Sequence, residues 1–451
     1  MITRLLLALL SIAICTDTSF AASKISARSS ATLPLTGAET IGIIQGGADK
    51  KTTLSTLGGG TIYYPESYGA VHDDTTDDSA EIQSAIDAAA AVCGTVQFLP
   101  GASYRVTSSL VLKSCVTLHG FSSFGNRNYF TTSRITSHCA CDLFTISADT
   151  TNVTIDGMTL VADTSGGGGD VFDFGAFSMT YLRVTNGWVQ QQNVAKSIMR
   201  MTDTAGKYFG FNFFDNMVWT YPDGNSAIQF ILVTATVNNV KFSNSVVEQV
   251  AQTTASTYVF KIASSLAGTY AEDIKFDHVV CEICRGGMLD AQSVRNFTLD
   301  TIGVYDMTAV PDNSIVAFST FPGNSATSGV LITGSSIKRN HATVADVYID
   351  GTVAGQGAIT FINSVIGRAK GSSTATADGG FVSIQSSVAN WDVATHLDLA
   401  DGAITAISYP FASLPALSNG SILFCSDCNA TCTAGSSTGR MCFRENGAWT
   451  H

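Results

Sequence analysis

A nine-residue pattern recurs at intervals of 23 to 34 residues from Val153 onward. Apolar residues alternate at its start, a turn-favouring residue stands fifth, and another apolar residue stands eighth. The eight copies begin at Val153, Leu182, Phe211, Val240, Ile274, Phe297, Val330 and Ile359, and a degenerate ninth copy lies near Val382. Alternation broken by Asn, Asp or Gly indicates two short strands joined by a tight bend. A repeat of this length predicts a solenoid of stacked coils around a continuous core.

The eight aligned copies favour an all-β parallel β-helix over a β-sandwich, which would require them to align by accident, and composition agrees with a strand-rich fold. Charged residues make up 13% of the 451-residue chain, and 41 glycines accompany many Ser, Thr and Val residues. Small and β-branched residues favour strands. The formal net charge of −12 argues against nucleic acid as a partner, because binding to phosphates needs Lys and Arg. It argues equally against anionic lipid head groups.

Four segments are expected along the chain. Residues 1–22 combine one arginine, a short apolar run and a small-residue site, as a secretory signal peptide does. Residues 23–60 form an extended N-terminal segment, 61–410 the parallel β-helix, and 411–451 a small Cys-containing C-terminal module. The protein is therefore expected to be secreted or extracellular, with no membrane insertion after signal removal, because the apolar run is too short for a span.

The stretch "YGAVHDDTTDDSAEIQSAIDAAAA" (Tyr68–Ala91) is expected to cover the open end of the solenoid with a helix. Asp77 or Asp78 provides an N-cap, and Glu81 lies in the first turn, where it favours the helix dipole. One face is apolar, as a capping helix requires, through Ile82, Ala85, Ile86 and Ala89. The acidic cluster of Asp73, Asp74, Asp77 and Asp78 is accordingly interpreted as helix-start and loop chemistry rather than as a catalytic or metal site.

This stretch, together with "GTVQFLPGASYRV" and "VTLHG", resembles the N-terminal cap of pectate-lyase-superfamily right-handed β-helix proteins, which include phage tailspikes. "LPLTGAETIGIIQGGADKKTTLSTL" (Leu33–Leu57) and "CSDCNATCTAGSSTGRMCFRENGAW" (Cys425–Trp449) are similar to segments of phage and prophage tail proteins. The resemblance implies a right-handed β-helix, a homotrimer and, for a phage-derived protein, a place in the virion tail.

Ten cysteines remain after signal removal, so disulfides are possible in an exported chain. Cys93 and Cys115 flank one strand and form the most natural bridge. Cys139 and Cys141 lie too close in an extended strand to pair with each other easily. Cys281 and Cys284 are expected in the core or in a bridge. Near the C-terminus, the spacing of Cys425, Cys428, Cys432 and Cys442 fits no standard zinc finger and favours disulfides over zinc.

The eighth place after each register start predicts a solvent-facing stripe across successive coils. It contains Gln190, Trp219, Glu248, Glu282, Tyr305 and Lys338. Glu248 and Glu282 would lie on adjacent coils, where two carboxylates suit glycoside hydrolysis. Asp306 is a possible third catalytic carboxylate. Substrate binding is expected from Gln190, Trp219, Tyr305 and Lys338, because aromatic rings stack on sugars.

Other residues fit turn chemistry better than catalysis. Asp215 and His278 fall at the bend position, where Asn186, Asn244 and Asn363 also appear. Asp203 and Asp223 would complete a rival acidic group with Asp215.

The sequence thus predicts a glycan depolymerase that cleaves a surface or exopolysaccharide without a cofactor or metal. A hydrolase is favoured over a lyase, which needs cationic help that a negative stripe lacks. A non-catalytic glycan-binding tail fibre or surface adhesin is the alternative, and a purely structural spike is the third.

Overall fold

The structure is a computed structural model with two compact units, Met1–Gly59 and Gly60–His451. It describes residues 40–45, 48–53, 61–122, 132–163, 167–175, 177–202, 206–222, 227–250, 258–282, 284, 286–305, 314–324, 327–337, 347–349, 359–371, 382–385, 388–391, 397–399, 408–409, 422–425, 440–445 and 448–450. The first unit holds an antiparallel hairpin of β1 (Thr40–Gln45) and β2 (Ala48–Thr53).

The second unit begins with β3 (Ile62–Tyr63), the 3-10 helix η3 (Pro65–Tyr68), β4 (Asp73–Asp77) and α1 (Ser79–Ala90). Short strands follow: β5 (Thr95–Gln97), β6 (Ser103–Val106), β7 (Leu110–Leu112), β8 (Thr117–His119), β9 (Ser133–Ser137), β10 (Phe144–Ile146), β11 (Thr150–Asp156), β12 (Met158–Ala162) and β13 (Phe172–Asp173). The middle coils contain β14 (Met179–Gln191), β15 (Met199–Thr202), β16 (Tyr208–Pro222), β17 (Phe230–Thr234), β18 (Thr236–Val250), β19 (Phe260–Ser264), β20 (Ala271–Glu282), β21 (Leu289–Gln292), β22 (Val294–Asp300) and β23 (Gly303–Tyr305). The last elements are β24 (Val316–Ser319), β25 (Ser328–Thr333), β26 (Ser336–Ile337), β27 (Val347–Ile349), β28 (Ile359–Ile362), β29 (Val365–Gly371), β30 (Val382–Gln385), β31 (Val388–Trp391), β32 (Leu397–Leu399), β33 (Ser408–Tyr409), β34 (Ile422–Cys425), β35 (Arg440–Glu445) and β36 (Ala448–Thr450).

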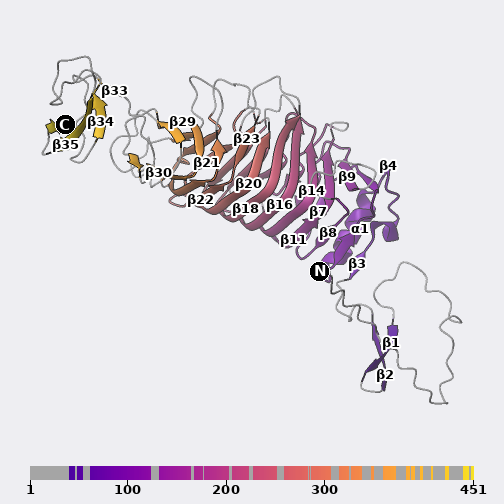
Figure 1. The fold of residues 1–451 in the computed structure, drawn as a ribbon. Helices are drawn as coiled ribbons and strands as arrows, with labels where there is room; N and C mark the ends of the chain where they lie inside the picture. The colour runs from indigo at the N-terminus through magenta and orange to yellow at the C-terminus, as the bar shows by residue number, and fades with distance from the viewer. Residues whose placement is uncertain are drawn as a thin grey trace, which may run out of the picture. The chain divides into compact units, whose positions relative to one another are not determined.

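The strands stack in parallel as three ladders, so the predicted all-β parallel β-helix is confirmed (Figure 1). Ladder 1 runs through β3, β5, β8, β11, β14, β16, β18, β20, β22, β25, β28, β30 and β32. Ladder 2 runs through β4, β6, β9, β12, the second halves of β14, β16, β18 and β20, and then β23, β26, β29 and β31. Ladder 3 runs through β7, β10, β13, β15, β17, β19, β21, β24 and β27. β33–β36 form a separate four-stranded sheet.

The core contains rows of stacked phenylalanines. The rings of Phe214 and Phe276 lie on either side of Phe242, with centroid distances of 4.6 and 5.0 Å. Phe230 and Phe260 form a second row, 4.5 Å apart, and both meet Phe242 edge-on. Identical inward positions on successive coils bring these rings together, because neighbouring parallel strands are about 4.8 Å apart. The repeat therefore produces the continuous core expected of a solenoid.

The predicted repeat register is confirmed for every copy but one. Val153 pairs with Leu182, Val240 with Ile274, Ile274 with Phe297, Phe297 with Val330, and Val330 with Ile359. The exception is the copy assigned to start at Phe211. There Asn212, not Phe211, pairs with Val240, so this coil is shifted by one residue.

The shift has a clear physical cause. Phe211 is apolar and resembled an inward position, yet it lies outside with 43% of its surface exposed. Asn212 is buried instead, and its amide replaces missing backbone pairing: Oδ1 accepts from the Leu182 N–H at 2.8 Å, and Nδ2 donates to the Met179 carbonyl at 3.2 Å. A buried side-chain amide is tolerated when both its carbonyl and its NH2 group are hydrogen-bonded, whereas a buried polar side chain without hydrogen bonds is not.

We expect Asn212→Ala to lower the free energy of unfolding by about 1–3 kcal/mol, because it leaves buried backbone groups of Leu182 and Met179 unpaired. Asn212→Leu restores the apolar residue found in the other coils and should not rescue stability, since leucine offers no hydrogen bond. Urea denaturation followed by circular dichroism measures both variants. An Asn212→Leu protein as stable as the parent would contradict this role.

The N-terminal cap agrees with the sequence analysis. α1 buries its expected face of Ile82, Ala85, Ile86 and Ala89 against the first coils. Asp78 is the N-cap residue, but its carboxylate accepts from the N–H groups of Val71 and His72 rather than from the helix. Asp77 accepts from the Ser79 N–H in its place.

The acidic cluster is engaged in loop hydrogen bonds, in agreement with its interpretation as helix-start and loop chemistry. Asp73 accepts from the N–H groups of Thr75 and Thr76, and these bonds hold the pKa of its carboxyl below the usual range. Asp74 accepts from the Ser103 hydroxyl at 2.9 Å.

Three disulfides join described cysteines. The predicted Cys93–Cys115 bridge is confirmed and links two adjacent coils. The expectation that Cys139 would not pair with Cys141 is wrong, because the two stand in a bend rather than in an extended strand and are bridged, with Cα atoms 5.1 Å apart. Cys281 and Cys284 are buried and also bridged.

Several predictions fall on residues outside those described, namely the signal peptide 1–22, Asp203, Asp223, Asp306, Lys338, Cys428 and Cys432. Among the described residues, no helix has the length and apolar character needed to cross a bilayer.

Candidate functional site

The predicted stripe occupies the outward positions of ladder 2, with one correction. In register, Gln190 pairs with Thr220, Thr220 with Glu248, Glu248 with Glu282, and Glu282 with Tyr305. Trp219 is not in this column. The one-residue shift of its coil turns Trp219 inward, so it is fully buried, with its ring 5.2 Å from Phe230.

The rest of the stripe is only partly accessible. Thr220, which takes the place assigned to Trp219, is 1% exposed and accepts a hydrogen bond from the Trp188 indole. Gln190, Glu248 and Glu282 are half-buried. The adjacency predicted for Glu248 and Glu282 is confirmed by their direct pairing.

Ladder 1 carries two further columns of outward side chains, which the repeat alignment did not single out as a site. The first, termed the Asp column, pairs His119, Asp156, Thr185, Asp215, Ser243, Asp277, Asp300 and Thr333 in register. The second, termed the Lys column, lies two residues earlier on the same strands and contains Thr117, Thr154, Arg183, Phe213, Lys241, Lys275 and Thr298. Residues two apart on a strand share a face, so both columns face the same side.

Asp215 belongs to the Asp column because of the same one-residue shift. The sequence placed Asp215 at the bend, but Asn216 occupies the bend with a positive φ of 57°, beside Asn186 and Asn244. His278 does occupy the bend, as expected, with a φ of 53°. Asn216 therefore takes the bend position, and Asp215 lies one residue before it on the strand.

A depression of about 370 Å³ opens over β8, β11, β14 and β16. It is lined by Thr117, His119, Thr154, Asp156, Arg183, Thr185, Asn186, Phe213 and Asp215. Carboxylates, an imidazole, a guanidinium and one aromatic ring thus meet in a single concave site. Such convergence of polar groups in a hollow marks a candidate active site.

Asp156 is held firmly at one side of this depression. Its Oδ1 accepts from the Thr185 hydroxyl at 2.6 Å and from the Asn186 amide at 2.7 Å. Its Oδ2 lies 3.0 Å from His119 Nδ1. These partners fix the orientation of the carboxylate, and Asp156 in turn orients the imidazole of His119.

Asp215 is held on one oxygen only. Its Oδ1 accepts from the Ser243 hydroxyl at 2.6 Å and from the Asn244 amide at 2.9 Å. Its Oδ2 has no hydrogen-bond partner among the residues that the structure describes. Asp156 and Asp215 are separated by one intervening coil, that of Thr185, so their backbones are about 9.6 Å apart.

The cations of the Lys column differ in their partners. Arg183 and Lys241 lie on either side of the Phe213 ring, 5.3 and 5.5 Å from its centroid. Lys241 also pairs with Asp277 at 3.2 Å. Arg183 makes no ion pair within the described part of the chain, is exposed, and lines the depression.

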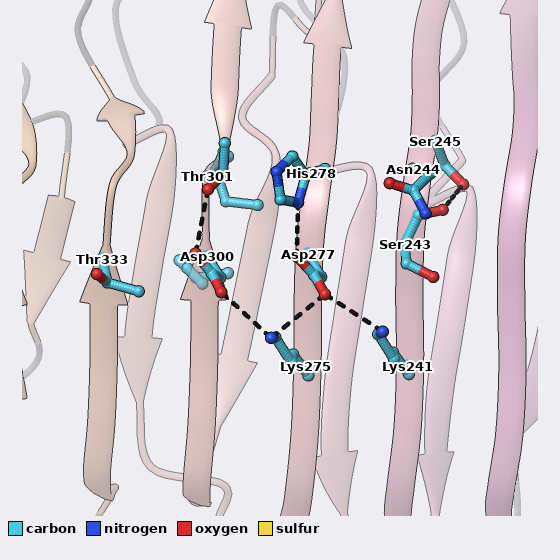
Figure 2. A network of polar contacts seen from close by, with 12 residues as sticks. Lys241, Ser243, Asn244, Ser245, Lys275, Asp277, His278, Asp300, Thr301 and Thr333 are labelled. Atoms are coloured by element: carbon cyan, nitrogen blue, oxygen red, sulfur yellow. Dashed lines mark hydrogen bonds and ion pairs between the residues drawn. The ribbon is translucent and has the colours of Figure 1, made fainter. Parts of the chain in front are cut away.

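Beyond the depression, the two columns join in an ion-pair network (Figure 2). Figure 2 shows Lys275 between Asp277 and Asp300, at 3.3 and 3.2 Å, with Lys241 and His278 also contacting Asp277. Partial burial alone would raise the pKa of Asp277, but hydrogen bonds from His278, Lys241 and Lys275 outweigh it and hold that pKa below its usual range. Burial alone would lower the pKa of Lys275, but Asp300 and Asp277 raise it.

This network should make stability depend on pH in a defined direction. A carboxyl with a depressed pKa stabilises the fold above its unfolded pKa of about 3.9, and this stabilisation is lost as the pH falls through the folded value. The raised pKa of Lys275 affects stability in the alkaline range. Its stabilising contribution is lost as the pH rises above about 10.4. We expect the Tm difference between the parent and Asp277→Asn to be constant from about pH 8 to 9, above the range in which histidine side chains ordinarily titrate, and to vanish in acid. A difference unchanged in acid would contradict the network's contribution.

A group of three carboxylates lies elsewhere, at the edge of ladder 3. Ligand atoms of Asp142, Asp170 and Asp173 lie within 4.8 Å of one another. Arg200 already compensates this charge, with Nη2 2.6 Å from Asp170 and 3.2 Å from Asp173. Burial raises the pKa of Asp170, which is 1% exposed. The cluster is therefore explained as an ion pair and gives no metal assignment.

Two exposed aromatic rings stack on the outward face of ladder 1, two residues before Arg183 and Phe213. Tyr181 and Phe211 are 52% and 43% exposed, and their ring centroids lie 4.9 Å apart with planes 8° from parallel. Both residues have positive φ, 55° and 57°. Positive φ costs a bulky residue about 1–2 kcal/mol, whereas a stacked pair contributes about 0.5–1.5 kcal/mol. The stack therefore does not offset the backbone cost of the two residues.

No known protein family matches the chain, and no curated protein matches it. Solved structures with a similar fold include a tailspike of Acinetobacter baumannii phage AM24, with 16% identity, a TM-score of 0.49, and coverage of 80% of this chain and 58% of the tailspike. Another is the catalytic unit of a GH87 α-1,3-glucanase from Streptomyces thermodiastaticus, with 15% identity, a TM-score of 0.47, and coverage of 77% of this chain and 68% of the glucanase. A third is the A-module of the Azotobacter vinelandii mannuronan C-5 epimerase AlgE6, with 18% identity, a TM-score of 0.43, and coverage of 76% of this chain and 100% of the module. The chain thus spans little more than half of the tailspike. At these identities and TM-scores the likeness concerns the fold alone.

Proposed function

We propose that the protein is a glycan depolymerase that hydrolyses a surface or exopolysaccharide in the depression on ladder 1. The observation that carries this proposal is the pair of carboxylates, Asp156 and Asp215, facing one depression from strands two coils apart. Inverting glycosidases place two carboxyl groups about 6.5–9.5 Å apart to leave room for a water molecule. A backbone separation of about 9.6 Å is close to the upper end of that range.

The hydrogen bonds support different roles for the two carboxyl groups. Asp215, which lines the depression and makes its hydrogen bonds to described residues through Oδ1, donates a proton to the glycosidic oxygen as the bond from that oxygen to the anomeric carbon breaks. Asp156, fixed by Thr185 and Asn186, accepts a proton from the water that attacks the same carbon. The products are one new reducing end and one hydroxyl end.

A specific observation also favours a second reaction, β-elimination. His119 is oriented by Asp156, and Arg183 lies in the same depression without an ion pair to any described residue. A lyase needs a base for the proton beside a uronate carboxylate and a cation that neutralises the carboxylate. The absence of such cationic help on the predicted stripe was the reason for favouring hydrolysis, and the depression supplies it. Hydrolysis stays the first proposal because both carboxylates face the site.

Glu248 and Glu282 remain a second proposed catalytic pair for the same reaction. Their direct pairing places their backbones about 4.8 Å apart, near the separation that suits a retaining enzyme. Asp306 would be their third carboxylate, and Gln190, Tyr305 and Lys338 would bind the sugar. The half-buried surroundings and the loss of Trp219 from this column make the pair the weaker of the two sites.

The proposed location is extracellular. Disulfides between described cysteines, Cys93–Cys115 and Cys281–Cys284, support an oxidising compartment. A homotrimer is proposed on the resemblance to tailspike-like β-helix proteins, and a place in a virion tail on the resemblance of Leu33–Leu57 and Cys425–Trp449 to segments of phage tail proteins. Polysaccharide is the proposed partner. The alternative to a depolymerase is a non-catalytic adhesin, which would bind the same polysaccharide without cleaving it.

One experiment tests these proposals together. The purified full chain is incubated with a panel of soluble bacterial and plant polysaccharides, and new reducing ends and ultraviolet-absorbing unsaturated ends are measured separately. We expect reducing ends without unsaturated ends from one polymer. Unsaturated ends would establish the lyase instead. Binding to a polymer without new ends would establish the adhesin, and neither binding nor cleavage would contradict a glycan function.

A further inference from the structure

A column of left-handed residues runs along ladder 1 near the start of its strands. Its members all have positive φ, namely Cys93, Cys115, Asn152, Tyr181, Phe211, Asn239, Asp273, Asn296 and Gly329. Asn, Asp and Gly are the residues that tolerate this conformation. The first two members are joined by a disulfide. Within this column only Tyr181 and Phe211 are bulky and aromatic, and no disulfide holds them in this conformation as it does Cys93 and Cys115.

The surroundings of the two rings differ from those of the neighbouring aromatic residue. The faces of Phe213 are covered by Arg183 and Lys241. The rings of Tyr181 and Phe211 cover each other on one face only, because they are stacked in parallel. The next members of the column on the two sides are Asn152 and Asn239, two exposed residues with shorter side chains, and the Tyr208 ring lies 6.4 Å from that of Phe211. Each aromatic residue thus has an asparagine as its next neighbour along the column.

An aromatic face beside an amide is suited to a sugar ring. The C–H face of a pyranose packs on the aromatic ring, and the amide offers a donor and an acceptor for ring hydroxyls. The two rings lie near the depression, because Tyr181 and Phe211 stand two residues before Arg183 and Phe213, which line it. Tyr181 precedes Thr185 by four residues on β14, and Phe211 precedes Asp215 by four residues on β16, so each aromatic residue lies about 13 Å from the Asp column along its strand.

We propose that Tyr181 and Phe211, with Asn152 and Asn239, form a separate glycan subsite that binds a pyranose of the same polysaccharide chain several residues away from the cleaved bond. This inference rests on the proposed function, because the occupant is the polymer that enters the depression. The subsite retains the chain between successive cleavages and has no part in the chemical step. It also accounts for bulky residues at two backbone positions that favour Asn.

The test exploits the preference of the column for Asn. The double variant Tyr181→Asn/Phe211→Asn removes both rings while supplying residues that accept the backbone conformation, so its Tm should equal or exceed that of the parent. Binding is measured by affinity electrophoresis of the full chain in gels cast with each polysaccharide of the panel. We expect about a tenfold rise in the apparent Kd for the polymer that retards the parent protein. Cleavage of short oligosaccharides derived from that polymer should stay unchanged.

Controls separate the subsite from the proposed function. Leu266→Asn removes a similarly exposed apolar side chain in the turn after β19 and should leave retardation unchanged. Equal retardation of the parent and the double variant would overturn the subsite alone. A parent protein that no polysaccharide in the panel retards would overturn the glycan function, and the subsite with it. A double variant that is retarded less and also loses turnover of short oligosaccharides would place the rings in the reaction site and overturn their separate role.

Discussion

Asp215→Asn should abolish polysaccharide cleavage, with a loss of at least about 100-fold in turnover. The amide preserves the hydrogen-bonding shape beside Ser243 and Asn244 but cannot donate a proton to the glycosidic oxygen. A positioned acid or base contributes about 10²–10⁴-fold to a reaction rate, and an asparagine retains almost none of this. Because the substitution changes the chemistry and hardly the binding, the variant should still bind the polymer.

The matched comparison is Glu248→Gln, a change of the same kind at the rival carboxylate pair. We expect Glu248→Gln to retain most of the turnover, since Glu248 lies on ladder 2 and not in the depression. The two substitutions are assayed side by side for new chain ends. Loss of cleavage in Glu248→Gln with full activity in Asp215→Asn would transfer the active site to Glu248 and Glu282.

Phe242→Ala should lower the free energy of unfolding by about 3–5 kcal/mol. Phe242 is 1% exposed and contacts four other rings of the core, Phe214, Phe276, Phe230 and Phe260. Truncation removes apolar contact area and leaves a cavity that the neighbouring coils cannot fill, because their positions are fixed by the strand ladders.

Chemical denaturation followed by tryptophan fluorescence measures the loss of stability. Trp219 reports on the core near Phe242, because it packs edge-on against Phe230. Val194→Ala is the control, since Val194 is 47% exposed and its truncation should change stability by less than about 0.5 kcal/mol. Similar stabilities of the two variants would show that the phenylalanine rows do not hold the coils together.

The repeat predicted the solenoid and almost all of its register, because inward apolar residues at a constant interval can pack only on one another. One coil departs from the predicted register, with Asn212 rather than Phe211 paired with Val240. Phe211 and Asn212 exchange the usual roles of apolar and polar residues, since the Asn212 amide bonds buried backbone groups and Phe211 stacks on Tyr181. An alignment of apolar positions cannot detect a buried residue whose polarity is satisfied by hydrogen bonds.

That single shift also determined which site residues could be found. It placed Trp219 on the surface when it lies in the core, and it placed Asp215 in a turn when it faces the depression. The pairing of Glu248 with Glu282 was predictable because both coils keep the common register. The depression itself was not, since a hollow depends on the relative sizes of side chains from four strands. A signal was nonetheless present: Asn216 directly follows Asp215 and fits the bend better.

A crystal structure of the full chain with Asp215→Asn, grown with oligosaccharides of the polymer that the parent protein cleaves, tests the proposed site most directly. We expect a sugar chain in the depression, with a glycosidic oxygen within hydrogen-bond distance of the amide that replaces the Asp215 carboxylate and the anomeric carbon on the side of Asp156. A sugar chain bound over Glu248 and Glu282, with the depression free of sugar, would contradict the assignment of the active site to ladder 1.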